Sequence, residues 1–123
     1  HIAIANPLLA PYGLAAQQSL QHLALWTELQ GKLLRGNNVS QAQQFLMTGN
    51  ADWAFVPLSP LLKELGIAYW SIPANWYQPI RQQAILLQSA QYNDAAVAFM
   101  DFLQSKSARQ LIKQQGYLLP SRN

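Results

Sequence analysis

The hydrophobic positions of this chain follow two patterns, one typical of buried strands and one of helices. Short apolar runs bounded by Pro, Gly or Asn predict strands, and they lie at residues 2–6, 51–56, 67–72 and 80–87. Longer segments with apolar residues at helical spacing predict helices, which begin near Gly13, Val39, Ser59, Asn93 and Ser107. The helical pattern after Gly13 fades near Trp26, and Gly66 ends the short helix from Ser59.

Polar residues and glycines mark the ends of these elements. Residues 31–38 form a break, and Asn37 or Asn38 is a good N-cap for a helix from Val39 whose apolar face includes Ala42 and Phe45. That helix ends at residues 48–50, which contain a glycine stop signal. Residues 73–79 form a loop between prolines, and the last helix ends at Gly116. The order of elements predicts an α/β fold with a mainly parallel sheet.

Composition limits the protein to a globular class. The chain has 123 residues, 50% hydrophobic and 11% charged, and no Cys, which excludes disulfides, Cys zinc sites and Cys nucleophiles. Its net charge of +3 comes from basic residues scattered along the chain, so we predict no nucleic-acid binding. Apolar runs are too short to span a bilayer, so we expect no membrane insertion. Because the first residue is His1, we expect a processed product or a fragment.

Motifs for catalysis are largely absent. His1 and His22 are the only histidines, and the acidic residues are isolated, without the spacing of a metal site. The sequence contains no P-loop, dinucleotide fingerprint or nucleophile elbow. We therefore predict a protein that is not an enzyme, with no cofactor and no metal ligands. The four tryptophans offer stacking surfaces, but core packing or partial burial is the expected role for most of them.

Two predicted helix starts, at Tyr12-Gly13 and at Val39, follow loops that leave sheet elements. First-turn amides lack acceptors within their helix and lie at the positive end of its dipole. Two such starts directed at one point would bind an anion without Lys or Arg. The alternative is a pair of ordinary loop–helix junctions, which every α/β fold contains and most of which bind nothing.

The residues around these helix starts resemble the periplasmic molybdate-binding proteins of ABC importers. The resemblance rests on segments 4–7, 10–16, 36–42 and 48–52, and it continues through 70–73, 77–82, 98–103 and 115–117. It covers essentially the whole chain. It implies a ligand-binding function in which molybdate or tungstate is held as an oxyanion by neutral donors. It also implies a periplasmic location and the importer's permease as a partner.

The resemblance assigns ligand-binding roles to Tyr12 and Val39, each expected to donate a backbone N–H, with the side chains mattering less. Some family members add a tyrosine hydroxyl from a later strand, but Pro57 occupies the matching position, so that contact should be missing. Selectivity over sulfate is expected from cavity size, because the charges are equal. The alternatives are the ligand-sensing domain of a transcription regulator, a receptor for sulfate or another small anion, and an enzyme built on the same lobe.

The resemblance also predicts the architecture, a periplasmic-binding-protein-like (type II) lobe with helices flanking the sheet. Residues 1–90 are expected to form the second ligand-binding lobe, and residues 91–123 the C-terminal helices that pack on the family's first lobe. That first lobe has no counterpart in this sequence, so we expect half a site and very weak binding by this chain alone. The apolar faces with Phe99, Leu103 and Leu111 should then self-associate or repack on their own lobe.

Overall fold

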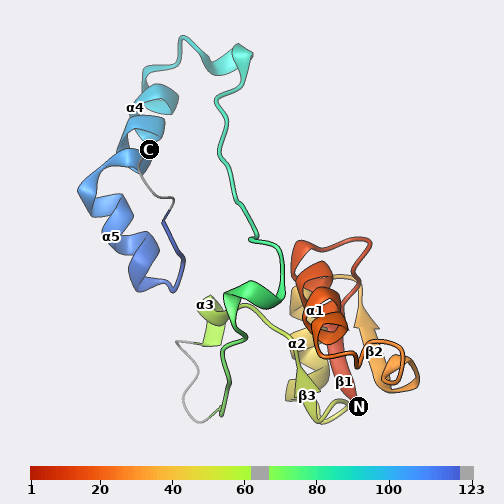
Figure 1. The fold of residues 1–123 in the computed structure, drawn as a ribbon. Coiled ribbons are helices and arrows are strands. Elements are labelled where there is room, and N and C mark those ends of the chain that lie inside the picture. The colour runs from red at the N-terminus through yellow and green to blue at the C-terminus, as the bar shows by residue number, and fades with distance from the viewer. Residues whose placement is uncertain (62–66, 120–123) are drawn as a thin grey trace. The chain divides into compact units, whose positions relative to one another are not determined.

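The computed structural model describes residues 1–61 and 67–119, which belong to two compact units (Figure 1). The first unit contains residues 1–57 and 67–80, and the second contains the described residues of 58–66 and 81–123. The division predicted at residue 90, between a lobe and C-terminal helices, stays a prediction. Among the described residues, no helix is long and apolar enough to cross a membrane.

A parallel sheet forms the centre of the first unit. Its three strands are β1 (Ile2–Ala5), β2 (Leu33–Gly36) and β3 (Trp53–Ala54), in the order β2-β1-β3. Ile2 pairs with both Leu33 and Trp53, so the neighbouring strands start level with β1. The central strand is the most deeply buried, because helices cover it on both faces. This arrangement confirms the predicted α/β class with a parallel sheet.

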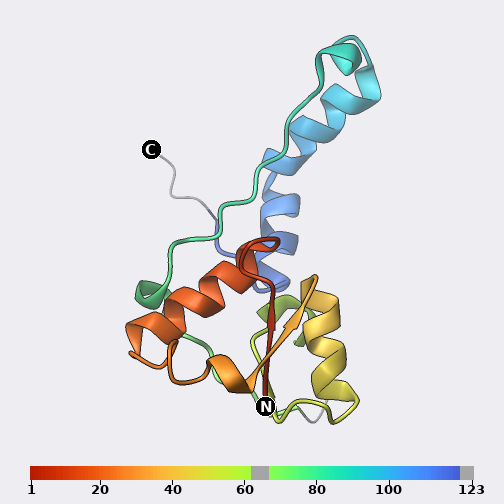
Figure 2. The same ribbon diagram turned by 90° about the vertical axis from the view of Figure 1, so that its right-hand side faces the viewer.

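Helices α1 (Pro11–His22) and α2 (Val39–Met47) cover opposite faces of the sheet (Figure 2). Successive side chains of a strand point to opposite faces. Ile4 therefore packs with Ala16 and Leu20 of α1, whereas its neighbour Ala3 packs with Ala42 of α2. The chain crosses from β1 to β2 through α1, and then back past β1 to β3 through α2. This is a doubly wound topology.

The predicted start and end of α2 are confirmed. Asn38 is its N-cap, with an extended backbone and a side-chain oxygen that accepts from the Gln41 N–H at 2.9 Å. The helix ends at Met47, and Gly49 follows with φ of +72°, a conformation that glycine adopts without strain. The predicted helix after Gly13 is also present, although it begins two residues earlier, at Pro11.

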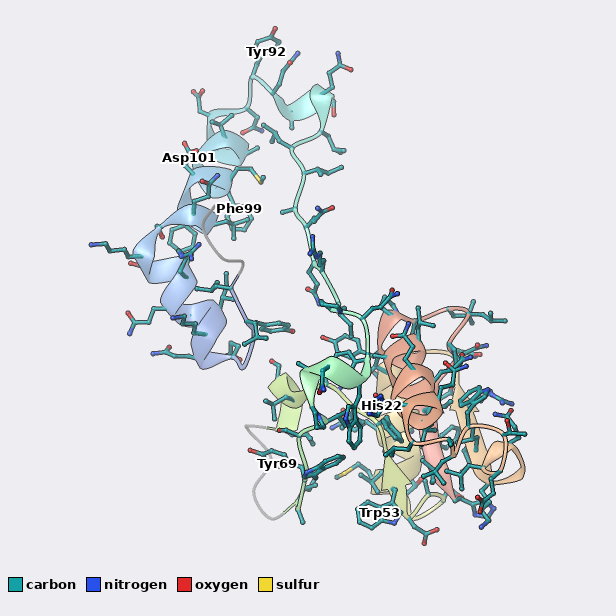
Figure 3. All side chains as sticks on the ribbon, in the orientation of Figure 1. His22, Trp53, Tyr69, Tyr92, Phe99 and Asp101 are labelled. Carbon is teal, nitrogen blue, oxygen red and sulfur yellow. The ribbon has the colours of Figure 1, made fainter. Side chains whose placement is uncertain are left out.

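The segment 67–80 packs on the outer side of α1 within the first unit. It contains the 3-10 helix Ala74–Trp76, whose Trp76 ring stacks on the His22 imidazole with 5.0 Å between ring centroids. Figure 3 shows His22 projecting from α1 toward this segment. The Gln78 N–H donates to Gln18 Oε1 at 2.9 Å and joins the segment to the helix a second time.

The second unit contains the two C-terminal helices that were predicted, and both are capped. They are α4 (Asp94–Gln104) and α5 (Lys106–Gln114), with N-caps Asn93 and Ser105. The short helix α3 (Leu58–Leu61) and the 3-10 helix Gln88–Ala90 also belong to this unit. Phe99 is 58% exposed and Leu111 is 54% exposed. The predicted partner of these apolar faces stays a prediction.

Several predicted strands are corrected by the structure. Strand β2 lies inside residues 31–38, which were predicted as a break, and the strand predicted at 51–56 is reduced to the two residues of β3. Residues 67–72 and 80–87 are described in full and contain no strand. Residues 81–87 are exposed, and no strand pairs with them in the part of the chain that the structure describes. Of the helix predicted at 59–65, residues 62–65 lie outside the described residues.

Candidate functional site

The candidate site lies at the carboxyl end of β1 and β2, where the chain leaves the sheet toward opposite faces. The two strands are adjacent and parallel, and their last residues, Ala5 and Gly36, are paired. The helix after β1 covers one face and the helix after β2 covers the other. Such a topological switch point opens a crevice outside the strand ends, which is where open α/β sheets bind ligands. The fold therefore directs both helix starts to the same edge of the sheet.

The junction between β1 and α1 is organised by Asn6. Its N–H donates to the Gly36 carbonyl at 2.7 Å and so extends the pairing of the two strand ends. Its carbonyl accepts from the N–H groups of Leu9 and Ala10, and its side-chain Oδ1 accepts from the Leu8 N–H, each at 3.0 Å. Helix α1 then begins with Pro11 and has no side-chain cap.

The junction between β2 and α2 is also held by side-chain oxygens. Gln41 Oε1 accepts from the Asn37 N–H at 2.7 Å, while Asn38 Oδ1 accepts from the Gln41 N–H at 2.9 Å. Within residues 1–61 and 67–119, the N–H groups of Val39 and Ser40 have no hydrogen-bond acceptor. These two donors lie in the first turn of α2, at the positive end of the helix dipole.

Two glycines allow both helix starts to lie directly against the strand ends. A Cβ on Gly13 would lie 2.2 Å from the Ala5 carbonyl oxygen, and one on Gly36 would lie 2.9 Å from the Ala42 nitrogen. Real Cβ atoms do not approach backbone atoms this closely. Both glycines are buried. The site is therefore made of closely packed main-chain atoms, because at both glycines there is no side chain between the helix start and its neighbouring backbone.

The side chains near the two helix starts carry no formal charge. Residues 6–13 and 36–42 contain neither acidic nor basic residues. Arg35 precedes Gly36, but its guanidinium donates to the Gln30 side chain and lies 5.9 Å from the centre of the Trp26 ring. Among the described residues, no cluster of His, Asp or Glu could hold a metal ion. Binding at this edge would therefore depend on neutral donors.

The ion pair between the His1 amino group and Asp52 lies away from this edge. The hydrogen bond from that amino group lowers the pKa of the Asp52 carboxyl below its ordinary value, and their opposite charges add to the effect. Both groups lie near the amino ends of β1 and β3, whereas the candidate site lies at the carboxyl ends. The titration of Asp52 is therefore not expected to affect the candidate site.

Comparison with known proteins places the chain in a family. The model of the family described as bacterial extracellular solute-binding proteins matches residues 1–118. The chain belongs to this family. A relative in Azotobacter vinelandii, the molybdate-binding protein ModA, is 43% identical over 120 residues, which cover 95% of this chain and 48% of the relative. This solute-binding chain thus spans about half the length of the relative it matches.

Solved structures of solute-binding proteins share the fold. The periplasmic molybdate-binding protein of Azotobacter vinelandii matches with a TM-score of 0.87 and 39% identity, over 98% of this chain and 55% of that one. A substrate-binding domain assigned to a candidate molybdenum ABC transporter of Clostridium difficile matches with a TM-score of 0.78 and 26% identity, over 98% and 53%. The predicted resemblance to molybdate-binding proteins is confirmed by these relatives.

The structure places Tyr12 and Val39 of this solute-binding protein at the first turns of the two helices that start at one edge of the sheet. Tyr12 is the second residue of α1, and Val39 is the first residue of α2. Both side chains are partly buried. Their assignment as ligand-binding residues stays a prediction. Pro57, predicted to remove a tyrosine contact, lies three residues after β3 and is also partly buried.

Sequence reasoning missed the supporting residues of the candidate site. Asn6, Gly13 and Gly36 were recognised only as parts of motifs, without a role of their own. A signal for Asn6 was present, because Asn before Pro at the end of a strand favours a turn closed by the Asn side chain. No local signal reveals that Gly13 lies against Ala5, since that approach depends on how α1 packs over the sheet.

Proposed function

We propose that this chain is part of a periplasmic molybdate-binding protein of an ABC importer. In this proposal it contributes one side of an oxyanion site, with the N–H groups of Tyr12 and Val39 as donors. The observation that carries the proposal is that the first turns of two helices start at the same uncharged edge of the sheet. The 43% identity to a molybdate-binding relative supports the choice of ligand.

The proposed donors suit a transported oxyanion. Backbone N–H groups at a helix start stabilise negative charge through hydrogen bonds and the helix dipole. A neutral site avoids burying Lys or Arg beside the ligand, so release to a permease does not leave an unpaired buried cation. Molybdate or tungstate is the cargo here, and the proposed role requires no cofactor and no catalytic residue.

Molybdate and sulfate carry the same charge, so selectivity in the proposed site must come from size. Donors on the main chain of two helix starts are held by the sheet and cannot move as flexible side chains do. A larger oxyanion can reach donors that a smaller one contacts only at lengthened distances, and hydrogen bonds weaken as distance increases. A rigid pair of donors therefore favours one anion size.

Calorimetric titration of the full-length protein with molybdate, tungstate and sulfate tests this proposal. We expect tight binding of molybdate and tungstate and little binding of sulfate. The 123-residue chain, titrated alongside, should bind very weakly. Each hydrogen bond to a charged acceptor contributes about 1.5–3 kcal/mol, so a chain that supplies only some of the donors loses most of the affinity.

Two results would contradict the proposal in different ways. Absence of oxyanion binding by the full-length protein would rule out the ligand and favour a sensor or a receptor for another solute. Nanomolar molybdate binding by the 123-residue chain alone would show that one side of the site suffices.

A further inference from the structure

The loop between β1 and α1 directs its hydrogen-bond donors to a single residue. Pro7 has no N–H, so the loop at 7–10 carries N–H groups only on Leu8, Leu9 and Ala10. All three of these groups donate to Asn6, one to its side chain and two to its carbonyl. Because Pro11 also lacks an N–H, the next one along the chain is that of Tyr12.

We infer that Asn6 is a positioning residue for the oxyanion site, an inference that rests on the proposed function. Its side chain closes the loop by accepting from the Leu8 N–H, and its carbonyl accepts from the N–H of Ala10, the N-cap of α1. Its N–H bond to Gly36 connects the same loop to the strand that leads into α2. Asn6 thereby sets the spacing between the two helix starts.

The inference also explains which amides of the loop are not available to a ligand. Loop amides in the first connection after a strand are the usual contacts of anions in α/β folds. Here Asn6 engages those of Leu8, Leu9 and Ala10. A site can select an oxyanion by its size only if the number of N–H donors and the distances between them are fixed.

The test is titration of full-length Asn6→Ala and Asn6→Ser with molybdate and with sulfate. The Ala variant removes the acceptor for the Leu8 N–H, whereas a Ser hydroxyl can partly replace it. We expect Asn6→Ala to weaken molybdate binding about fivefold and to lower the ratio of molybdate to sulfate affinity. Asn6→Ser should recover part of the molybdate affinity and part of the ratio of molybdate to sulfate affinity. A purely structural role would leave the affinity ratio unchanged.

Asn93→Ala is the matched control. Asn93 is the N-cap of α4 in the second unit, and its side chain accepts from the Ala96 N–H at 3.2 Å, so the variant loses a comparable bond. We expect it to leave the affinity ratio unchanged. An unchanged ratio in Asn6→Ala, with wild-type protein binding molybdate, would overturn the inference and leave the proposed function standing. Wild-type protein that binds no molybdate would overturn the proposed function itself.

Discussion

Val39→Pro is expected to weaken molybdate binding by roughly 10- to 150-fold while leaving the fold intact. The substitution removes one backbone N–H, and a hydrogen bond to a charged acceptor contributes about 1.5–3 kcal/mol. Val39 is the first residue of α2, a position where proline costs little because its N–H has no partner within the helix. Asn38 has an extended backbone, the conformation that a following proline favours. Calorimetry on the full-length protein measures the effect.

Two variants separate the loss of the donor from other effects of proline. Val39→Ala keeps the N–H and should retain molybdate affinity. Lys106→Pro places proline at the first residue of α5, which also follows an extended N-cap, and it should leave binding unchanged. If Val39→Pro binds molybdate as tightly as wild-type protein while its melting temperature is unchanged, the Val39 amide is not a ligand.

Gly13→Ala is expected to destabilise the first unit by about 3 kcal/mol or more. The new Cβ would lie 2.2 Å from the Ala5 carbonyl oxygen and 2.8 Å from the Asn6 carbonyl carbon. These are backbone atoms of the central strand and its turn, so they cannot move aside as a flexible side chain would. Alanine is favoured over glycine inside a helix by about 1 kcal/mol, which is too little to offset the clash.

Urea unfolding followed by tryptophan fluorescence measures this change. All four tryptophans of the chain lie in the first unit, so their emission reports on the part that contains Gly13. Gly31→Ala is the matched control, because a Cβ there meets nothing within 4 Å and its free energy of unfolding should change by less than about 1 kcal/mol. Equal stability of the two variants would show that α1 does not lie against the end of β1.

Helix caps and glycine stops were predictable because they act within a few residues. Asn38 and Asn93 accept hydrogen bonds from the backbone three residues ahead, and Gly49 takes its positive φ within the turn that it forms. The first strand was also predictable, since a continuous apolar run of its length is buried on both faces. The two helix starts of the candidate site were also predictable, because the residues that mark a helix start lie next to it in the sequence.

Strand pairing was much less predictable. The apolar run at 80–87 resembles a strand as strongly as residues 2–6 do, yet within residues 1–61 and 67–119 it pairs with no strand and is not itself one. Leu33–Gly36, with two apolar residues beside Arg35, becomes a strand because β1 offers its edge for pairing. Hydrogen bonds between strands join residues far apart in the chain, so a local pattern shows the capacity to pair but not the presence of a partner.

The sequence by itself determined the α/β class, the caps, the uncharged helix starts and the resemblance to molybdate-binding proteins, because each depends on neighbouring residues. The tertiary structure decided that α1 and α2 cover opposite faces of the sheet, which places a topological switch point between β1 and β2. It also decided the roles of Asn6 and Gly13, whose contacts depend on how the strand ends and helices pack. Packing brings together segments that are distant in sequence, so local sequence patterns cannot predict these contacts.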